Sequence, residues 1–173
     1  MSSLINFEFR SLPAMRIIGK AICPKMDMQD NPIPAFWSKC FTDGTFKILT
    51  ELPAEHVDKD YVGFMCDWDG KDTFTYICGM LLAAGTPVPA GFDFKDVPAS
   101  TAAVGWIRGP EKENYQAAHT LTQQELEKKG YCSNSAAGWC MEYYNCPRFT
   151  QPQTNGDVIL DYYIPCQPAA AMP

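Results

Sequence analysis

The two halves of this sequence carry the same short motifs in the same order. Each half begins with an extended segment that a proline interrupts, continues through a strand and a helix, and ends with two further strands. The matching segments are Phe9–Ala14 with Phe94–Ala99, Gly63–Trp68 with Gly138–Tyr143, and Tyr76–Ile77 with Tyr163–Ile164. Short matches that recur in one order indicate an internal duplication. We therefore expect a single domain over residues 1–166, built from pseudo-repeats at about residues 4–84 and 90–166.

This duplication predicts an α+β fold. Two strand–helix–strand–strand units would form an antiparallel sheet with two main helices on one face, and a groove between the helices would be the natural ligand site. The first helix should stop at Asp43-Gly44, and the second should run from about Glu111 to Lys129. The expected packed side of the second helix carries Tyr115, Ala118, Leu121 and Leu126. Residues 167–173 are expected to form a disordered tail.

The charge and the aromatic content narrow the function classes. The formal net charge is −6 and the pI is about 4.8, which argues against direct nucleic-acid binding because phosphate contact calls for a basic surface. Aromatic residues make up 13% of the chain, and aromatic side chains can line ligand pockets as well as fill cores. These totals are compatible with a neutral or cationic small-molecule ligand.

The cysteines fit neither a disulfide framework nor a metal site. No Cys-x-x-Cys pair occurs among the eight cysteines, which are Cys23, Cys40, Cys66, Cys78, Cys132, Cys140, Cys146 and Cys166. Neither His56 nor His119 clusters with them in the sequence as a zinc site would require. We expect reduced thiols, no metal and no cofactor. The first residues lack the apolar core of a signal peptide and no apolar stretch could span a bilayer, so the expected location is the cytoplasm.

A lone carboxylate stands out in the segment Gly138–Asn145 (GWCMEYYN), which is typical of a strand. Alternate side chains of a strand point to opposite faces, so one face carries Cys140, Glu142 and Tyr144, and the other carries Trp139, Met141 and Tyr143. Burying an ionised carboxylate is costly unless it pairs, neutralises or meets a ligand. Two interpretations of Glu142 remain open: a solvated sheet face, or the bottom of an aromatic pocket that takes a cation.

In its layout and local motifs, nearly the whole chain resembles the GyrI-like small-molecule-binding domain. The matching segments are Leu12–Ala14, Ile33–Trp37, Val97–Thr101 leading to Arg108–Pro110, and Gly138–Asn145. In Gly138–Asn145 the pocket glutamate of the family corresponds to Glu142. The resemblance implies the duplicated fold, and binding of lipophilic, often cationic, aromatic compounds. The same domain is the effector-binding part of AraC-type and MerR-type multidrug-sensing regulators. One departure is Ala102, where members often carry a tyrosine.

The candidate ligand-binding residues follow from the strand pattern, the repeat and the resemblance together. They are Glu142, Tyr144, Trp106, Trp37, Phe41, Tyr76, Tyr163 and Asp67. The repeat places Asp67 at the position of Glu142 in the other half, although turn chemistry could equally explain an aspartate there. For Trp106 and the aromatics of the first helix, a core position is the competing interpretation.

Three functions are compatible with these observations. The first is binding of amphipathic aromatic or cationic small molecules, as a sensor or sequestering module; without a helix-turn-helix segment, any role in transcription would act through a partner chain. The second is hydrolysis of electrophilic small molecules with Glu142 as general base, an activity that the resemblance also implies. The third is a protein-binding role like that of the gyrase inhibitor for which the family is named. The protein partner and the ligand cannot be named from the sequence.

Overall fold

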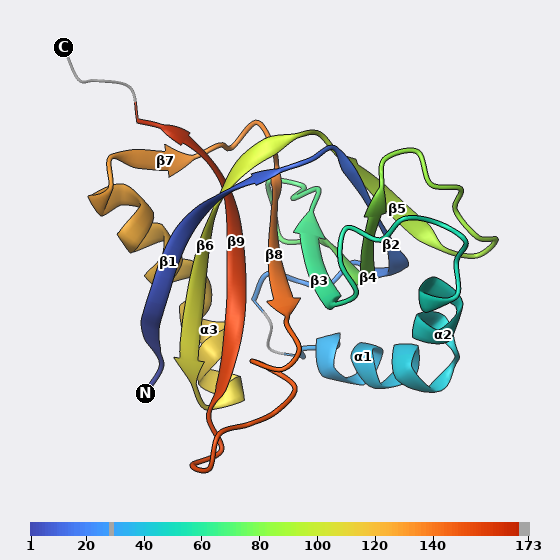
Figure 1. Cartoon of the computed structure of the whole chain (residues 1–173), viewed down its shortest axis with the longest axis horizontal. Helices are drawn as coiled ribbons and strands as arrows, with labels where there is room; N and C mark the ends of the chain where they lie inside the picture. Colours follow the sequence, from blue (N-terminus) through green and yellow to red (C-terminus); the bar gives the residue numbers. More distant parts are fainter. Residues whose placement is uncertain (28–29, 170–173) are drawn as a thin grey trace. The chain divides into compact units, whose positions relative to one another are not determined.

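The computed structural model describes residues 1–27 and 30–169, and it divides the chain into two compact units. Unit 1 combines Met1–Leu12 with the chain from Ser100 onward, and unit 2 comprises Pro13–Ala99. The described residues form nine strands and three helices, and every strand pairing described below is antiparallel (Figure 1). The predicted α+β class is therefore confirmed. No helix in the described part of the chain combines the length and apolarity needed to cross a membrane.

Unit 2 is a four-stranded sheet with two short helices. Its strands follow the spatial order β3–β4–β2–β5, and the elements are β2 (Met15–Ile22), α1 (Ile33–Thr42), α2 (Thr45–Thr50), β3 (Tyr61–Cys66), β4 (Thr75–Ala83) and β5 (Asp93–Val97). Gly44, with φ of 83°, separates the helices, as the predicted stop at Asp43-Gly44 required. Strand β4 is buried from Tyr76 to Leu82. Its even-numbered side chains join a core with residues of both helices, including Cys40, Phe46 and Leu49.

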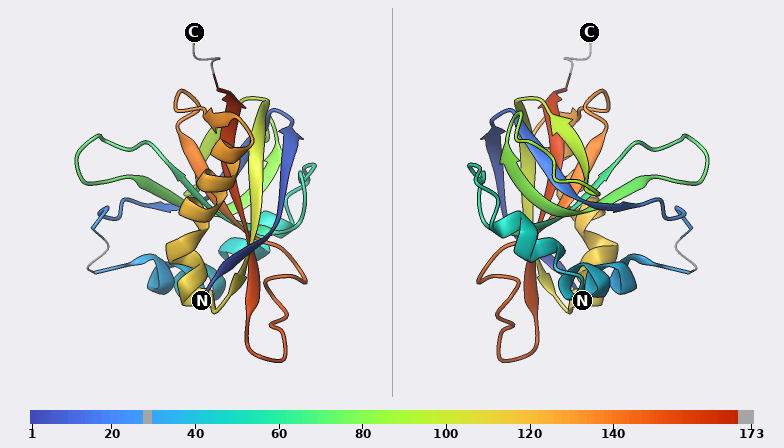
Figure 2. Two further views of the ribbon diagram at one scale, coloured as in Figure 1. Left: turned by 90° about the vertical axis from the view of Figure 1, so that its left-hand side faces the viewer. Right: turned by 90° about the vertical axis from the view of Figure 1, so that its right-hand side faces the viewer.

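Unit 1 contains one long helix packed on its own strands. Its strands follow the order β1–β6–β9–β8, with β7 also paired to β9, and the elements are β1 (Ser3–Leu12), β6 (Ser100–Gly109), α3 (Glu111–Lys128), β7 (Tyr131–Ser133), β8 (Trp139–Tyr144) and β9 (Val158–Pro168). The helix α3 lies along one face of these strands (left view of Figure 2). Its predicted bounds are confirmed to within one residue.

The packed side of α3 differs from the predicted apolar stripe. The fully buried residues are Asn114, Ala118, Thr122 and Leu126, whereas Tyr115 is exposed. The reason is a close approach of α3 to β6: a Cβ atom at Gly105 would lie 2.3 Å from Thr122 Oγ1. Small or polar side chains permit this approach, and Asn114 Nδ2 donates hydrogen bonds to two backbone carbonyl oxygens, those of Gly109 and Val158.

The two compact units do not coincide with the two halves of the sequence. Each half contains the expected strand–helix–strand–strand order, with β2, α1, β3 and β4 in one and β6, α3, β8 and β9 in the other. The extended segment that opens each half, however, pairs with a strand of the opposite half. Strand β1 from the first half pairs with β6, and β5 from the second half pairs with β2. Strand β9 also continues through Pro168, so Gln167 and Pro168 are not tail residues; residues 170–173 lie outside the described ones.

In unit 2, Gly19 of β2 stands opposite Gly79 of β4. A Cβ atom at Gly79 would lie 2.1 Å from the carbonyl oxygen of Ile18, and one at Gly19 would lie 2.2 Å from that of Cys78. Both neighbours are backbone atoms, which cannot move aside by changing a rotamer. The two glycines therefore act as a spacer that sets the separation of the two strands.

We predict that Gly79→Ala lowers the free energy of unfolding by about 1–3 kcal/mol, because the added methyl group would clash with the backbone of the paired strand β2. Urea unfolding followed by circular dichroism would measure the change. Thr75→Ala, which removes atoms from a half-buried side chain in the same strand, is the matched control and should have a smaller effect. Equal midpoints for Gly79→Ala and the unmodified chain would contradict the close approach.

Candidate functional site

Glu142 lies in the middle of β8, on the face of the unit 1 sheet that carries α3. Its carboxylate oxygen Oε2 accepts a hydrogen bond of 2.8 Å from the hydroxyl of Tyr144, and both side chains are half-buried. In the antiparallel pairing, Glu142 stands opposite Tyr162 of β9. The predicted alternation along this strand is confirmed, because Trp139, Met141 and Tyr143 are all buried.

The helix α3 brings two further side chains to this face. Tyr115 lies with its ring centroid 6.5 Å from that of Tyr144, nearly perpendicular to it, and its hydroxyl donates to Glu111 Oε1 at 2.7 Å. One turn later, His119 Nδ1 is 3.3 Å from the hydroxyl of Tyr162. That hydroxyl also lies 3.1 Å from Cys140 Sγ, to which it donates. We call the six residues Tyr115, His119, Cys140, Glu142, Tyr144 and Tyr162 the carboxylate cluster.

Desolvation shifts the pKa of three groups of the carboxylate cluster in the direction that disfavours their charged forms, although Tyr115 is 38% exposed. It raises the pKa of the Tyr115 hydroxyl, which the neighbouring carboxylates of Glu111 and Glu142 raise further. It also raises the pKa of the Cys140 thiol to about 12. Desolvation acts in the opposite direction on a base and lowers the pKa of His119, so its imidazole is neutral at pH 7. Glu142 is the one carboxylate among these six residues, and the other five are hydrogen-bonding or aromatic groups.

Two of the predicted site residues in unit 1 lie on the opposite face of the sheet. Tyr163 follows Tyr162 in β9 and stands opposite Met141, and Trp106 stands opposite Asp161. The guanidinium of Arg148 lies 4.1 Å from the centre of the Trp106 ring. The structure therefore groups Tyr144 with Glu142 but places Trp106 and Tyr163 away from them.

Three other predicted residues meet in unit 2. Trp37 Nε1 donates a hydrogen bond of 2.9 Å to the hydroxyl of Tyr76, and the rings of Trp37 and Phe41 are 5.9 Å apart. Tyr76 is completely buried, while Phe41 is 58% exposed. Together with Phe46 and Tyr61 these rings form an aromatic group on the helix side of the unit 2 sheet. The predicted groove between the main helices depends on the placement of the two units, and it stays a prediction.

Asp67 does not occupy the position of Glu142 in the other half. Met65 stands opposite Tyr76 in the first hairpin, as Glu142 stands opposite Tyr162 in the second, and both tyrosines face their helices. Met65 is therefore the counterpart of Glu142. Asp67 follows the end of β3 with φ of 52°, and its carboxylate is ion-paired with Lys95 at 2.5 Å. The short sequence match had shifted the correspondence by two residues.

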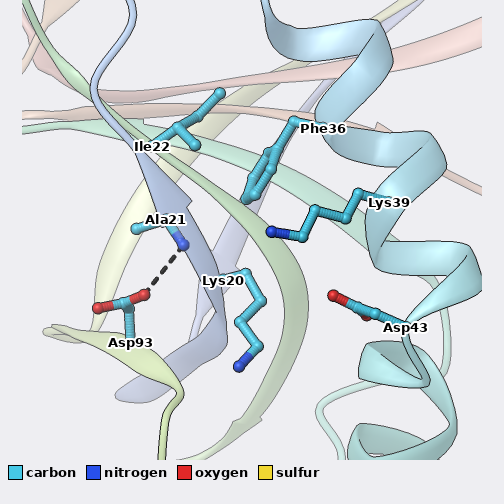
Figure 3. Close-up of a pocket in the computed structure, with 7 residues that line it drawn as sticks. All are labelled: Lys20, Ala21, Ile22, Phe36, Lys39, Asp43 and Asp93. Atoms are coloured by element: carbon cyan, nitrogen blue, oxygen red, sulfur yellow. Dashed lines mark hydrogen bonds between the residues drawn. The ribbon is translucent and has the colours of Figure 1, made fainter.

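Unit 2 also contains a hollow of about 260 Å³ between the end of β2 and α1 (Figure 3). It is lined by Lys20, Ala21, Ile22, Phe36, Lys39, Asp43 and Asp93. Lys39 and Asp43 point into it from α1 and the turn that follows. Asp93 Oδ2 accepts a hydrogen bond from the backbone of Ala21, and Lys20 donates to the carbonyl oxygen of Gly91. Its walls mix both signs of charge with a single aromatic ring, unlike the carboxylate cluster, and none of the predicted site residues lines it.

The predicted ligand-binding residues include two members of the carboxylate cluster, Glu142 and Tyr144, and omit the other four. Tyr115 is predicted for the packed side of the helix, and His119, Cys140 and Tyr162 are not among the predicted site residues. His119 and Tyr162 are separated by 43 residues and meet only because α3 packs on β9. The i, i+4 spacing of Tyr115 and His119 was the available signal, since it places both on one side of a helix. Among the described residues, no group of three or more His, Cys, Asp or Glu is arranged to hold a metal ion.

The pKa of His119 leads to a prediction about stability and pH. Because the pKa is lowered from its ordinary value of 6.5 in the folded chain, the unfolded chain binds a proton at higher pH than the folded chain does. The free energy of unfolding should therefore fall as the pH drops below about 6.5, and His119→Gln should remove this part of the decrease. Thermal unfolding of both chains from pH 8 to pH 5 would test it. Melting temperatures that stay a constant interval apart over this range would contradict the prediction.

Comparison with known proteins places the chain in a family. The family model for the GyrI-like small molecule binding domain matches residues 5–167. No curated protein matches the chain. Among solved structures, SAV2435 bound to tetraphenylphosphonium is similar over 94% of each chain, with a TM-score of 0.67 and 12% identity.

Two further solved structures show the same fold. A putative transcription regulation protein from Staphylococcus aureus MU50 is similar over 94% of this chain and 98% of its own, with a TM-score of 0.63 and 16% identity. EcmrR in a complex with DNA is similar over 95% of this chain but 58% of its own, with a TM-score of 0.57 and 15% identity. The duplicated fold and the match of residues 5–167 lead to one conclusion: the chain belongs to the family of GyrI-like small molecule binding domains.

Proposed function

We propose that this chain binds a lipophilic aromatic cation at the carboxylate cluster of unit 1. The observation that carries the proposal is the setting of Glu142, a half-buried carboxylate held by the Tyr144 hydroxyl at 2.8 Å. Aromatic rings of Tyr115, Tyr144 and Tyr162 lie around it. A carboxylate attracts a delocalised cation by charge, while ring faces add cation–π attraction and dispersion. A small inorganic cation would gain less here, because it would have to give up its hydration shell for one carboxylate.

Two comparisons support this choice of ligand class. SAV2435, which shares the fold, is bound to tetraphenylphosphonium, a cation whose charge is surrounded by aryl groups. EcmrR, which contains a similar domain, is found in a complex with DNA. We propose that this chain likewise acts as a sensor or sequestering module, and that any effect on transcription passes through a partner protein. A net charge of −6 disfavours direct DNA contact. Eight thiols without a disulfide favour a reducing compartment such as the cytoplasm.

Binding fits the geometry of Glu142 better than general-base catalysis does. The Tyr144 hydroxyl donates to Oε2 of Glu142, so a neighbouring side chain already engages this carboxylate oxygen. A cation site benefits from the same hydrogen bond, because it holds the charge in place. An electrophilic aromatic ligand should therefore be recovered intact after long incubation, and mass spectrometry would detect hydrolysis products if Glu142 acted as a base.

We predict that Glu142→Gln weakens the binding of tetraphenylphosphonium by about 1–3 kcal/mol, because the carboxylate supplies a partly desolvated charge. A neutral aryl compound such as triphenylmethanol should lose little affinity, since it does not use the charge. Isothermal titration calorimetry on the folded chain would measure both affinities.

Glu127→Gln is the matched control, because it makes the same change of charge on the exposed side of α3. It separates the local effect of Glu142 from that of the net charge. Tyr144→Phe should reduce the affinity for the cation less than Glu142→Gln does, since it removes only the hydrogen bond to the carboxylate. Equal affinity of the cation for Glu142→Gln and Glu127→Gln would contradict the proposal.

A further inference from the structure

The segment between β8 and β9, residues 145–157, carries two consecutive side chains that contact different faces of the unit 1 sheet. It leaves the sheet directly after Tyr144, the residue that holds Glu142. Its backbone is tied down on both sides: Phe149 N donates to the carbonyl oxygen of Asn145 at 2.8 Å, and Ile159 N donates to that of Arg148 at 3.2 Å. The segment is therefore an ordered part of the unit beside the carboxylate cluster.

Arg148 reaches the face opposite Glu142. Its Nη2 lies 2.5 Å from Asp161 Oδ2 and its Nε lies 3.2 Å from Asp161 Oδ1, a two-pronged pair with a carboxylate that is completely buried. The guanidinium carbon also lies over the ring of Trp106, 4.1 Å from its centroid. A paired, hydrogen-bonded guanidinium is a rigid anchor, and removing one partner of such a buried pair is strongly unfavourable.

Phe149 contacts the face that carries Glu142. Its ring lies 4.8 Å from the ring of Tyr144 at an angle of 74°, an edge-to-face arrangement. The side chain of Phe149 is half-buried, so part of its ring remains accessible beside Tyr144. Arg148 and Phe149 thus straddle the end of the β8–β9 pair, one anchored and the other next to the carboxylate cluster.

We propose that Phe149 is a specificity-determining wall of the carboxylate cluster, selecting cations that carry aryl groups, and that Arg148 is the positioning residue that holds it there. This inference rests on the proposed function of the cluster. An aryl group bound beside Tyr144 extends its contact onto Phe149, whereas an alkyl cation draws mainly on the charge of Glu142. The ion pair with Asp161 fixes the backbone at residue 148 and with it the position of the next ring.

The test compares two cations of the same charge, tetraphenylphosphonium and tetrapropylammonium. Phe149→Leu keeps an apolar side chain but removes the ring, so it should weaken binding of the aryl cation by about two- to tenfold and change that of the alkyl cation by less than twofold. Phe94→Leu, at an exposed phenylalanine of unit 2, is the matched control and should change neither affinity. An unchanged ratio of the two affinities in Phe149→Leu would show that Phe149 does not select aryl cations.

A double-variant cycle tests the role of Arg148. Arg148→Met alone would leave Asp161 without its guanidinium and could unfold the unit, so the neutral pair Arg148→Met/Asp161→Asn is made alongside it. Whichever of the two folds, as circular dichroism shows, should lower the affinity ratio as Phe149→Leu does. Adding Phe149→Leu should then cause no further loss, because the anchor acts through that ring. Additive losses would show that Arg148 does not act through Phe149.

The outcomes separate this inference from the proposed function. If both cations bind and Glu142→Gln weakens both while Phe149→Leu preserves their ratio, the proposed function stands and the wall is wrong. If Glu142→Gln leaves both affinities unchanged, the proposed binding site is wrong, and the proposed role of Phe149 is wrong as well. A ratio that falls in Phe149→Leu and in the Arg148 variant, together with a general loss in Glu142→Gln, supports both.

Discussion

The pairing of β8 with β9 determines the character of the candidate site. Glu142 stands opposite Tyr162 in this ladder, and both side chains point to the face covered by α3. The neighbours Trp139, Met141 and Tyr143 are buried on the other face, so a slip of one residue would bury the carboxylate and expose three large apolar side chains. Burial of these three side chains therefore fixes where the charge lies. Hydrophobic packing on one face of the strand positions an ionic group on the other.

The fold was predictable because periodicity and turn residues carry most of the information it needs. The bounds of α3, the break at Asp43-Gly44 and the alternation along β8 all follow from local pattern. The pairing of β1 and β5 with strands of the opposite sequence half was not predictable, since strand pairing depends on contacts between residues far apart in the sequence. Only the folded chain shows that β1 pairs with β6.

The site was harder to predict than the fold for a specific physical reason. Tyr162 and Tyr163 are adjacent and chemically identical, yet a strand sends them to opposite faces. The sequence match of Tyr76 to Tyr163 chose the wrong one of the pair, because Tyr76 faces its helix, as Tyr162 does. A shift of one residue in a strand exchanges a site residue for its neighbour on the other face. A second misalignment, this time of two residues, assigned Asp67 in place of Met65 to the position of Glu142.

The two strand–helix–strand–strand units share one contact and differ at the position beside it. In unit 2 a helix residue, Trp37, donates from its ring nitrogen to the hydroxyl of Tyr76; in unit 1, His119 lies against Tyr162 in the same way. Where unit 2 has Met65, unit 1 has Glu142. The hydrogen bond between a helix side chain and a strand tyrosine is thus common to both halves, and it orients the tyrosine ring in each. A carboxylate added to that shared frame needs only one more partner, the Tyr144 hydroxyl, to hold a charge beside aromatic rings. Met65 places a thioether at the same position of unit 2, so the side of the sheet that carries the helices has a carboxylate in one unit and an apolar group in the other.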